Sequence, residues 1–372
     1  MKKNIKKRSV KITMIITLII IIAFAGVFGF MKQPQFGEIP SGKRLVRIMA
    51  SPNYKSGSFQ NQKLVPVMTE GVSYLTVLKE FLFGKSSRNT PADNIPAKKT
   101  DLLNLDPGKN TMVWFGHSSY FLQLEGKTIL VDPVLSGSAS PVKFTTMSYK
   151  GSDNYSVDDL PDIDYLFITH DHWDHLDYET VMKLRSKVRK VITGLGTGAH
   201  LERWGYSPEN IIELDWNETA QLDNGFTATA TPAQHFSGRG VKRNLALWVS
   251  FVLKTPAMQV YFGGDSGYGP HYAEIGNTYG PFDLVFLECG QYNERWKYIH
   301  MKPEEVVQAS QDLKAKILMP VHWAKFSLSL HAWDEPIKRV TDESKRKNIH
   351  IIHPMIGEEV NLKEPVVNEA WW

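Results

Sequence analysis

The sequence predicts an α/β protein in which two β-sheets pack face to face and helices flank them. Short apolar runs rich in β-branched and aromatic residues, typical of strands, recur from residue 111 to residue 352. Helical patterns lie between and after these runs, an order that favours sheets covered by helices. The chain has 372 residues, 42% of them hydrophobic, which suffices for one large or two modest domains with a core.

The N-terminus carries a basic tail followed by an uncharged run over residues 12–31. A run of about 20 apolar residues is long enough to cross a bilayer as a helix. The flanking charges predict a single-pass cell-membrane protein with a cytoplasmic N-terminus and an extracytoplasmic main domain. A cleaved signal peptide, with Ala23-Phe24-Ala25 as its processing site, is the alternative and would give a secreted protein. Residues 1–32 are therefore interpreted as tail and anchor, with the basic side chains Lys2, Lys3, Lys6, Lys7, Arg8 and Lys11.

Residues 33–110 form a mixed segment, punctuated by Pro and Gly, that we interpret as an N-terminal arm. A helix is expected over residues 72–83. We interpret Phe81, Leu82 and Phe83 in it as core residues rather than as lipid contacts. The arm holds no catalytic grouping, so we expect it to pack on the main domain or to line its cleft.

Residues 111–372 are expected to form the catalytic domain. It opens with a strand at 111–115 and a hairpin of two strands, 120–124 and 127–131. The further strands are predicted at 164–168, 190–193, 211–214, 226–231, 246–253, 258–262, 284–287, 317–319 and 349–352. The helices are predicted at 178–186, 200–204, 303–313 and 332–343.

The sequence T-H-D-H-W-D-H-L-D at residues 169–177 directly follows the strand 164–168. It places three imidazoles and three carboxylates within nine positions on a loop that leaves a rigid sheet. A lone histidine is more often structural. Four potential ligands in the order H-x-H-x-D-H are hard to explain in that way, so the stretch indicates a metal site.

Three more strands end at a possible metal ligand. His235 follows 226–231, Asp265 follows 258–262 in the sequence G-G-D-S-G, and His322 follows 317–319. Each of these signals is weak alone. Together with the 169–177 loop they supply five His and two Asp, enough for two metal ions. Imidazole combined with carboxylate suits zinc, with iron or manganese as substitutes.

The composition argues against a nucleic-acid-binding protein and against an internal disulfide. The formal net charge is only +4, much of it from the basic tail, so no nucleic-acid partner is expected. Cys289 is the single cysteine, which excludes an internal disulfide, and we interpret it as a buried small apolar residue.

These motifs carry a family resemblance over about residues 47–353. The chain resembles the metallo-β-lactamase superfamily, and within it N-acyl-phosphatidylethanolamine-hydrolysing phospholipase D and its bacterial relatives. Besides the 169–177 loop, the likeness lies in W-F-G-H-S-S (114–119), V-D-P-V (131–134), P-A-Q-H (232–235), G-G-D-S-G (263–267), H-M-K-P-E-E (300–305) and P-V-H-W (320–323).

The resemblance implies the αββα four-layer sandwich of the metallo-β-lactamase fold, with two Zn²⁺ at one edge of the sheets. It implies that His170, His172 and His235 hold one zinc. It implies that Asp174, His175 and His322 hold the other. Asp265 would bridge the two. The activity implied is that of a hydrolase, a phosphodiesterase of the phospholipase D type that uses a metal-bridging hydroxide.

Other side chains are candidates for roles around the metals. Asp174 is expected to orient the attacking water. His300 is expected either to contact the substrate phosphate or donate a proton, or to be a structural residue ahead of the helix that begins at 303. Asp132 is either an acceptor for a ligand histidine or part of an ordinary Asp-Pro turn. We expect neither His117 nor His331 to be a ligand.

An anchored domain facing a membrane fits a lipid phosphodiester such as N-acyl phosphatidylethanolamine. The alternatives are a lactonase or a soluble-substrate phosphodiesterase on the same metals, and a surface protein that binds metal without turnover. The open two-metal site argues against the last of these, because a scaffold does not require one.

Overall fold

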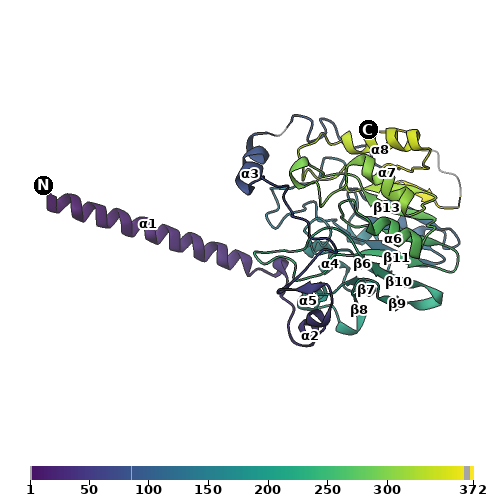
Figure 1. Cartoon of the computed structure of the whole chain (residues 1–372), viewed down its shortest axis with the longest axis horizontal. Helices are drawn as coiled ribbons and strands as arrows, with labels where there is room; N and C mark the ends of the chain where they lie inside the picture. The colour runs from purple at the N-terminus through teal and green to yellow at the C-terminus, as the bar shows by residue number, and fades with distance from the viewer. Residues whose placement is uncertain (1, 85, 364–368) are drawn as a thin grey trace.

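The computed structural model describes residues 2–84, 86–363 and 369–372, and it shows two sheets and flanking helices (Figure 1). The larger sheet has seven strands in the order β15-β3-β4-β5-β6-β7-β8. Their bounds are β3 Thr111–Trp114, β4 Tyr120–Leu124, β5 Lys127–Val131, β6 Ile163–Ile168, β7 Val188–Gly194, β8 Ile211–Leu214 and β15 Glu359–Asn361.

The smaller sheet has six strands in the order β14-β13-β12-β11-β10-β9. Their bounds are β9 Thr219–Gln221, β10 Thr227–Thr231, β11 Ser250–Lys254, β12 Gln259–Phe262, β13 Leu284–Glu288 and β14 Leu318–Val321. In both sheets antiparallel strands give way to parallel ones, at β5–β6 in the larger sheet and at β12–β13 in the smaller.

The main core lies between the two sheets, and β6 shows how the sequence builds it. Tyr165 and Phe167 belong to that core, whereas Leu166 and Ile168 belong to a second core on the other face of the same sheet. Successive side chains of a strand point to opposite faces, so a strand buried on both faces reads as one continuous apolar run. This is the run that the sequence shows before the 169–177 loop.

Helices cover the outer faces of both sheets. The second core packs the larger sheet against α4 (Tyr178–Leu184) and α5 (Gly198–Arg203). The smaller sheet is covered by α6 (His271–Thr278), α7 (Pro303–Asp312) and α8 (Glu335–Lys347), whose apolar residues join the main core. The four-layer arrangement expected from the sequence is therefore confirmed.

Most of the expected strands and helices are present, and the differences occur where a run lacks a strand partner. The strand expected at 246–253 begins only at Ser250, because Leu247 and Val249 donate their N–H groups to Leu195 and Thr169 in the other half of the molecule. The strand expected at 349–352 is reduced to a single bridge between Leu318 and Ile351. The short polar edge strands β9 and β15, and the helix α6, were not predicted.

The helix α1 (Lys2–Met31) projects away from the body of the protein (Figure 1). Its segment Ser9–Met31 is long and apolar enough to cross a membrane, and its most hydrophobic stretch of 18 residues is not buried against the rest of the protein. A signal sequence satisfies the same length and composition.

The arm after α1 packs onto the main domain through α2 (Gly42–Ala50), the hairpin of β1 (Tyr54–Lys55) and β2 (Ser58–Phe59), and α3 (Tyr74–Phe83). Ile48 and Phe59 are buried in the main core. Only α3 was expected. The interpretation of its aromatic residues was partly wrong: Phe81 stacks on Trp296, but the side chain of Phe83 is 82% exposed, and that of Leu82 lies outside the described part.

Candidate metal centre

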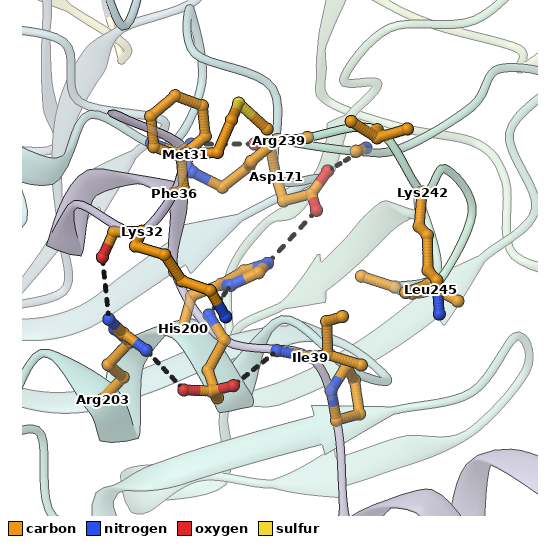
Figure 2. Close-up of a pocket in the computed structure, with 17 residues that line it drawn as sticks. Met31, Lys32, Phe36, Ile39, Asp171, His200, Arg203, Arg239, Lys242 and Leu245 are labelled. Carbon is orange, nitrogen blue, oxygen red and sulfur yellow. Dashed lines mark hydrogen bonds and ion pairs between the residues drawn. The ribbon is translucent and has the colours of Figure 1, made fainter. Parts of the chain in front are cut away.

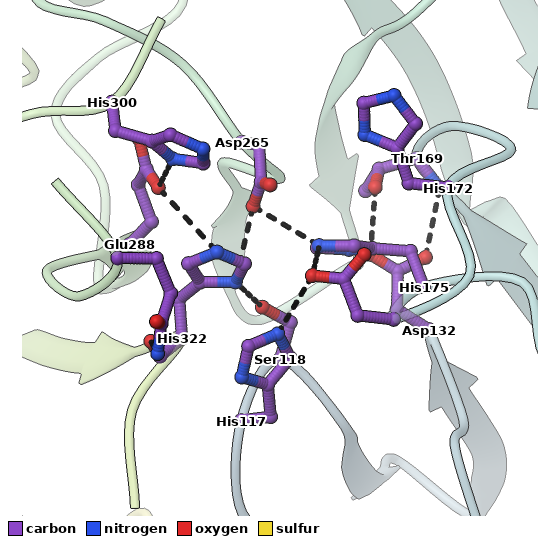
Figure 3. A network of polar contacts seen from close by, with 12 residues as sticks. His117, Ser118, Asp132, Thr169, His172, His175, Asp265, Glu288, His300 and His322 are labelled. Atoms are coloured by element: carbon purple, nitrogen blue, oxygen red, sulfur yellow. Dashed lines mark hydrogen bonds and ion pairs between the residues drawn. The ribbon is translucent and has the colours of Figure 1, made fainter. Parts of the chain in front are cut away.

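The described residues contain three groups of side chains whose possible ligand atoms lie within 4.8 Å of one another. The groups share members, and most of their residues lie at or soon after the ends of strands from both sheets. Figure 3 shows part of this network. The structure thus brings together all seven candidate ligands named from the sequence. The groups are His170, His172, His235 and Asp265; His117, Asp174, His175 and His322; and Asp265, Glu288, His300 and His322.

In the first group three ring nitrogens converge. His172 Nδ1 lies 2.9 Å from His170 Nε2 and 3.2 Å from His235 Nε2. His235 Nδ1 lies 2.9 Å from the Ile299 carbonyl, so it carries the proton and Nε2 keeps its lone pair. His172 Nδ1 can donate at most one proton, so it cannot form a hydrogen bond to both His170 Nε2 and His235 Nε2. The group therefore presents unpaired nitrogen lone pairs to a common point.

The second group joins a carboxylate to three imidazoles. Asp174 Oδ2 lies 2.9 Å from His117 Nε2 and 3.6 Å from His175 Nε2. His322 Nδ1 lies 2.9 Å from Ser118 Oγ. The structure thus places His117 among the candidate ligands, beside Asp174. Our expectation that His117 is not a ligand stays a prediction.

The carboxylate of Asp265 lies between the two groups. Its Oδ1 lies 3.1 Å from His175 Nε2 and 3.3 Å from His322 Nδ1. Its Oδ2 faces the first group, 3.8 Å from His170 Nε2. Gly264 permits this approach, because it has a φ of +59° and a Cβ there would lie 2.8 Å from the Thr169 side chain. This position fits a carboxylate that bridges two ions.

Asp132 is the partner of two motif residues. Its Oδ1 accepts from the Thr169 N–H at 2.8 Å, and its Oδ2 accepts from the Thr169 hydroxyl at 2.6 Å and from His175 Nδ1–H at 2.8 Å. Because the Thr169 hydroxyl donates to Asp132, it accepts from His170 Nδ1–H at 3.0 Å. In the neutral form of each ring, His170 and His175 thus carry their lone pair on Nε2. Asp132 is an acceptor for His175, a candidate ligand, rather than only part of a turn.

The donor set fits divalent cations. His175 Nε2 and Asp265 Oδ1 are buried without a hydrogen-bond partner, which is costly unless an ion completes them. Burial holds the pKa of His170 and His235 well below the ordinary value, so both rings are neutral, as metal binding requires. Burial also lowers the pKa of His175, but nearby Asp265 and other carboxylates more than reverse this and draw positive charge to the centre.

Glu288 is a residue of the centre that the sequence reasoning missed. It ends β13, is fully buried, and accepts from the main-chain N–H of Ser266 and Met301, both at 3.1 Å. Its Oε2 is hydrogen bonded to His300 Nδ1, which fixes that ring at the site. The signal was available as a carboxylate at the end of an apolar strand. At this strand end only the neighbouring Cys289 was interpreted from the sequence, and it is buried as expected.

Arg239 was also missed, and it ties the motif loop together. Its Nη1 donates to the carbonyls of Asp171 at 2.8 Å and Leu176 at 2.7 Å, near the two ends of the loop. Its guanidinium lies 3.9 Å from the Trp173 ring centre. Burial lowers the pKa of Arg239 to about 10, which leaves it cationic at neutral pH. No motif marks such a role in the sequence, because it depends on contacts distant along the chain.

Two of the histidines outside these groups have structural partners close to the site. His200 Nδ1 accepts from the Glu38 N–H at 2.9 Å, so its Nε2–H donates to Asp171 at 3.2 Å. His331 Nε2 accepts from the Gln291 N–H at 2.8 Å, and its Nδ1 lies 2.9 Å from the Ala332 carbonyl. Neither histidine belongs to the three groups found in the described part of the chain.

Comparison with known proteins places the chain in a family. Residues 127–323 match the family described as "Beta-lactamase superfamily domain". An uncharacterized protein of Mycobacterium tuberculosis is 37% identical over 87% of each chain. N-acyl-phosphatidylethanolamine-hydrolyzing phospholipase D 1 of Caenorhabditis elegans is 29% identical over 65% of this chain and 74% of its own. A solved metallo hydrolase of Ignicoccus hospitalis superposes with a TM-score of 0.50 at 21% identity, covering 68% of this chain and 97% of that one.

The sandwich fold and the clustered His and carboxylate ligands define a metal-dependent hydrolase. The chain belongs to the metallo-β-lactamase superfamily, as the motifs in its sequence indicated.

We predict that removing metal destabilises the protein, because the converging lone pairs and carboxylates then face one another uncompensated. Dialysis against a chelator should lower the free energy of unfolding by about 3 kcal/mol, the contribution of a ligand present at about a hundred times its Kd. Calorimetry before and after adding back Zn²⁺ measures this. A melting temperature unchanged by chelation would contradict a metal centre here.

Arg239→Met removes the two hydrogen bonds that hold the motif loop, and we expect metal affinity to fall about 10- to 100-fold, as for other groups that orient ligands. Competition with a chromophoric chelator gives the affinity. Arg203→Met, which removes a more exposed arginine paired with Glu38, is the matched control and should leave affinity unchanged. Equal affinities in the two variants would show that the loop needs no such support.

Proposed function

We propose that this chain is a zinc-dependent phosphodiesterase of the phospholipase D type that acts on N-acyl phosphatidylethanolamine-like lipids. The observation that carries the proposal is the position of the Asp265 carboxylate, with one oxygen toward His175 and the other toward His170. Such a carboxylate fits two cations close together, an arrangement common in enzymes that cleave phosphate esters. The name of the C. elegans relative supports the choice of substrate.

The ligands we propose are His170, His172 and His235 for one zinc, Asp174, His175 and His322 for the other, and Asp265 between them. When bound, the pair of ions would lower the pKa of a water and neutralise charge on the phosphoryl oxygens. The carboxylate of Asp174 would accept a hydrogen bond from the attacking water and orient it toward phosphorus.

His300 is proposed to protonate the leaving alkoxide. Its Nδ1 is held by buried Glu288, so Nε2 is the nitrogen left for substrate. Burial lowers the pKa of His300, so the ring is neutral at rest. Nε2 would take the proton released by the attacking water and pass it to the departing alkoxide oxygen. Burial raises the pKa of Glu288 well above its ordinary value, so Glu288 and His300 hold one proton between Oε2 and Nδ1, which keeps the ring in place.

The N-terminal segment is proposed to anchor the enzyme beside its substrate. Residues 1–32 would form the cytoplasmic tail and the membrane helix, 33–110 the arm, and 111–372 the extracytoplasmic catalytic domain. The support is the candidate span Ser9–Met31 and the lipid named in the C. elegans relative. Enzyme and lipid would then meet by diffusion within one membrane.

The full chain in detergent should release phosphatidic acid from N-acyl phosphatidylethanolamine, and Asp265→Ala should lower that rate by at least about two orders of magnitude. Mass spectrometry of the products measures this, with bis(p-nitrophenyl) phosphate and a lactone panel run in parallel. Asp158→Ala, at an exposed carboxylate, is the control. Opening of lactones alone would replace the proposal with a lactonase. Tight metal binding without turnover of any substrate would indicate a binding protein.

His300→Gln should distinguish a proton donor from a structural residue. We expect kcat/KM for an alkyl phosphodiester to fall about 100-fold or more, within the range for general acid catalysis. The loss on bis(p-nitrophenyl) phosphate should be much smaller, because p-nitrophenolate leaves without a proton. His331→Gln serves as the matched control. Equal losses on both substrates would assign His300 a structural role.

A further inference from the structure

The surface around the end of α1 exposes large apolar side chains that belong to two other segments. On α3, Leu75 is 75% exposed and Leu78 is 54% exposed, and residues three apart share one face of a helix. Phe81, one turn further along α3, stacks on Trp296 and so holds the helix against the body of the protein. In the loop 238–243, Val241 is 89% exposed. Such exposed apolar residues, close together, mark an interaction surface.

α3 touches the loop, and the loop in turn reaches the end of α1, so the surface is continuous. Arg243 Nη1 lies 3.4 Å from the Tyr74 hydroxyl, which joins the loop to α3. On its other side the loop lines a cavity of about 270 Å³ together with Met31 and Lys32 at the end of α1 (Figure 2). We call the surface formed by α3 and residues 238–243 the α3–loop face.

The charge of the α3–loop face suits a membrane of anionic lipid. Lys79, Lys242 and Arg243 are exposed beside the apolar residues, and Lys32 lies where α1 ends. Apolar side chains that enter the acyl boundary, with cations at headgroup level, are the pattern of segments that lie in a membrane interface.

The end of α1 is fixed against the metal-binding loop, which sets where a bilayer around α1 would lie. Phe36 packs edge-on against Phe30 of α1 and against Trp173 of the motif, each at 5.2 Å between ring centres. Arg239 Nε donates to the Gln35 carbonyl at 3.0 Å. α3 lies on the side of the body from which α1 projects (Figure 1). A bilayer that holds α1 would therefore meet the α3–loop face.

The α3–loop face also leads to the metal centre through a short row of side chains. The guanidinium of Arg243 lies 5.3 Å from the Phe236 ring centre. Phe236 packs on the ring of His172 with 4.4 Å between centres. A lipid headgroup at this face would be separated from the first group of ligands by only these side chains.

We propose that the α3–loop face is a second membrane contact, which rests on the bilayer that holds α1 and places the metal centre beside the lipid surface. The inference rests on the anchor in the proposed function, not on the reaction. The partner is the lipid leaflet itself, and the contact brings a phosphodiester headgroup to the metals without extracting the lipid from the membrane.

Single cysteines in the full chain test the contact, because the natural Cys289 is buried and escapes labelling. Leu75→Cys and Val241→Cys, each carrying an environment-sensitive fluorophore, are incorporated into lipid discs that contain anionic phosphatidylglycerol. Lys347→Cys, at the exposed end of α8, is the matched control. We expect the emission at 75 and 241 to shift to shorter wavelength and to be quenched by nitroxide-labelled lipid. The label at 347 should show neither effect.

Labels at 75 and 241 that behave like the label at 347 would overturn the proposal. A shift to shorter wavelength without quenching by nitroxide lipid would also overturn it, since it would show that another protein or a second copy of this chain covers the face. Failure of the full chain to enter lipid discs would remove the anchor on which the inference rests. None of these results depends on turnover, so they leave the proposed reaction to its own experiments.

Discussion

The position of one carboxylate, that of Asp265, depends on the packing of the two sheets and in turn organises the site. It leaves the end of β12 in the smaller sheet, while His170 and His175 leave the end of β6 in the larger. The aromatic core between the sheets sets the spacing of these strand ends, and Phe167 packs there against Phe262 with 5.2 Å between ring centres. The main core therefore positions the candidate ligands as well as stabilising the fold, because a shift of one sheet would separate them.

A layer of buried polar residues then fixes the orientation of the ligands. Asp132 sets the tautomer of His175, and Glu288 holds His300. Arg239 holds the backbone of the motif loop near both of its ends. Buried charges are expensive unless they are paired, so these contacts stabilise one arrangement of the centre over others. His175 Nε2, which remains without a hydrogen-bond partner, faces Asp265 in its middle.

Much of this architecture could be predicted because its signals are local. The continuous apolar run 164–168 predicted a doubly buried strand, and the motif after it predicted metal ligands on a loop. His235, Asp265 and His322 could be found because each follows a strand. Glu288 and Arg239 could not be found in the same way, since their roles arise from partners far along the chain. Residues 246–249 were misassigned because a buried apolar stretch that bonds to loops has the same composition as a strand.

The N-terminal arm joins helix α1 to the loop that carries the candidate ligands. The contacts from Phe30 through Phe36 to Trp173 mean that α1 is fixed to the same loop that carries His172 and Asp174. One set of contacts thus links the end of α1 to the loop of the candidate metal centre.

The most direct test of the central claim is anomalous diffraction from crystals of the zinc-loaded protein. Two peaks about 3.5–4 Å apart, one on each side of the Asp265 carboxylate, are expected for a paired centre. A single peak, or peaks that Asp265 does not contact, would contradict the account.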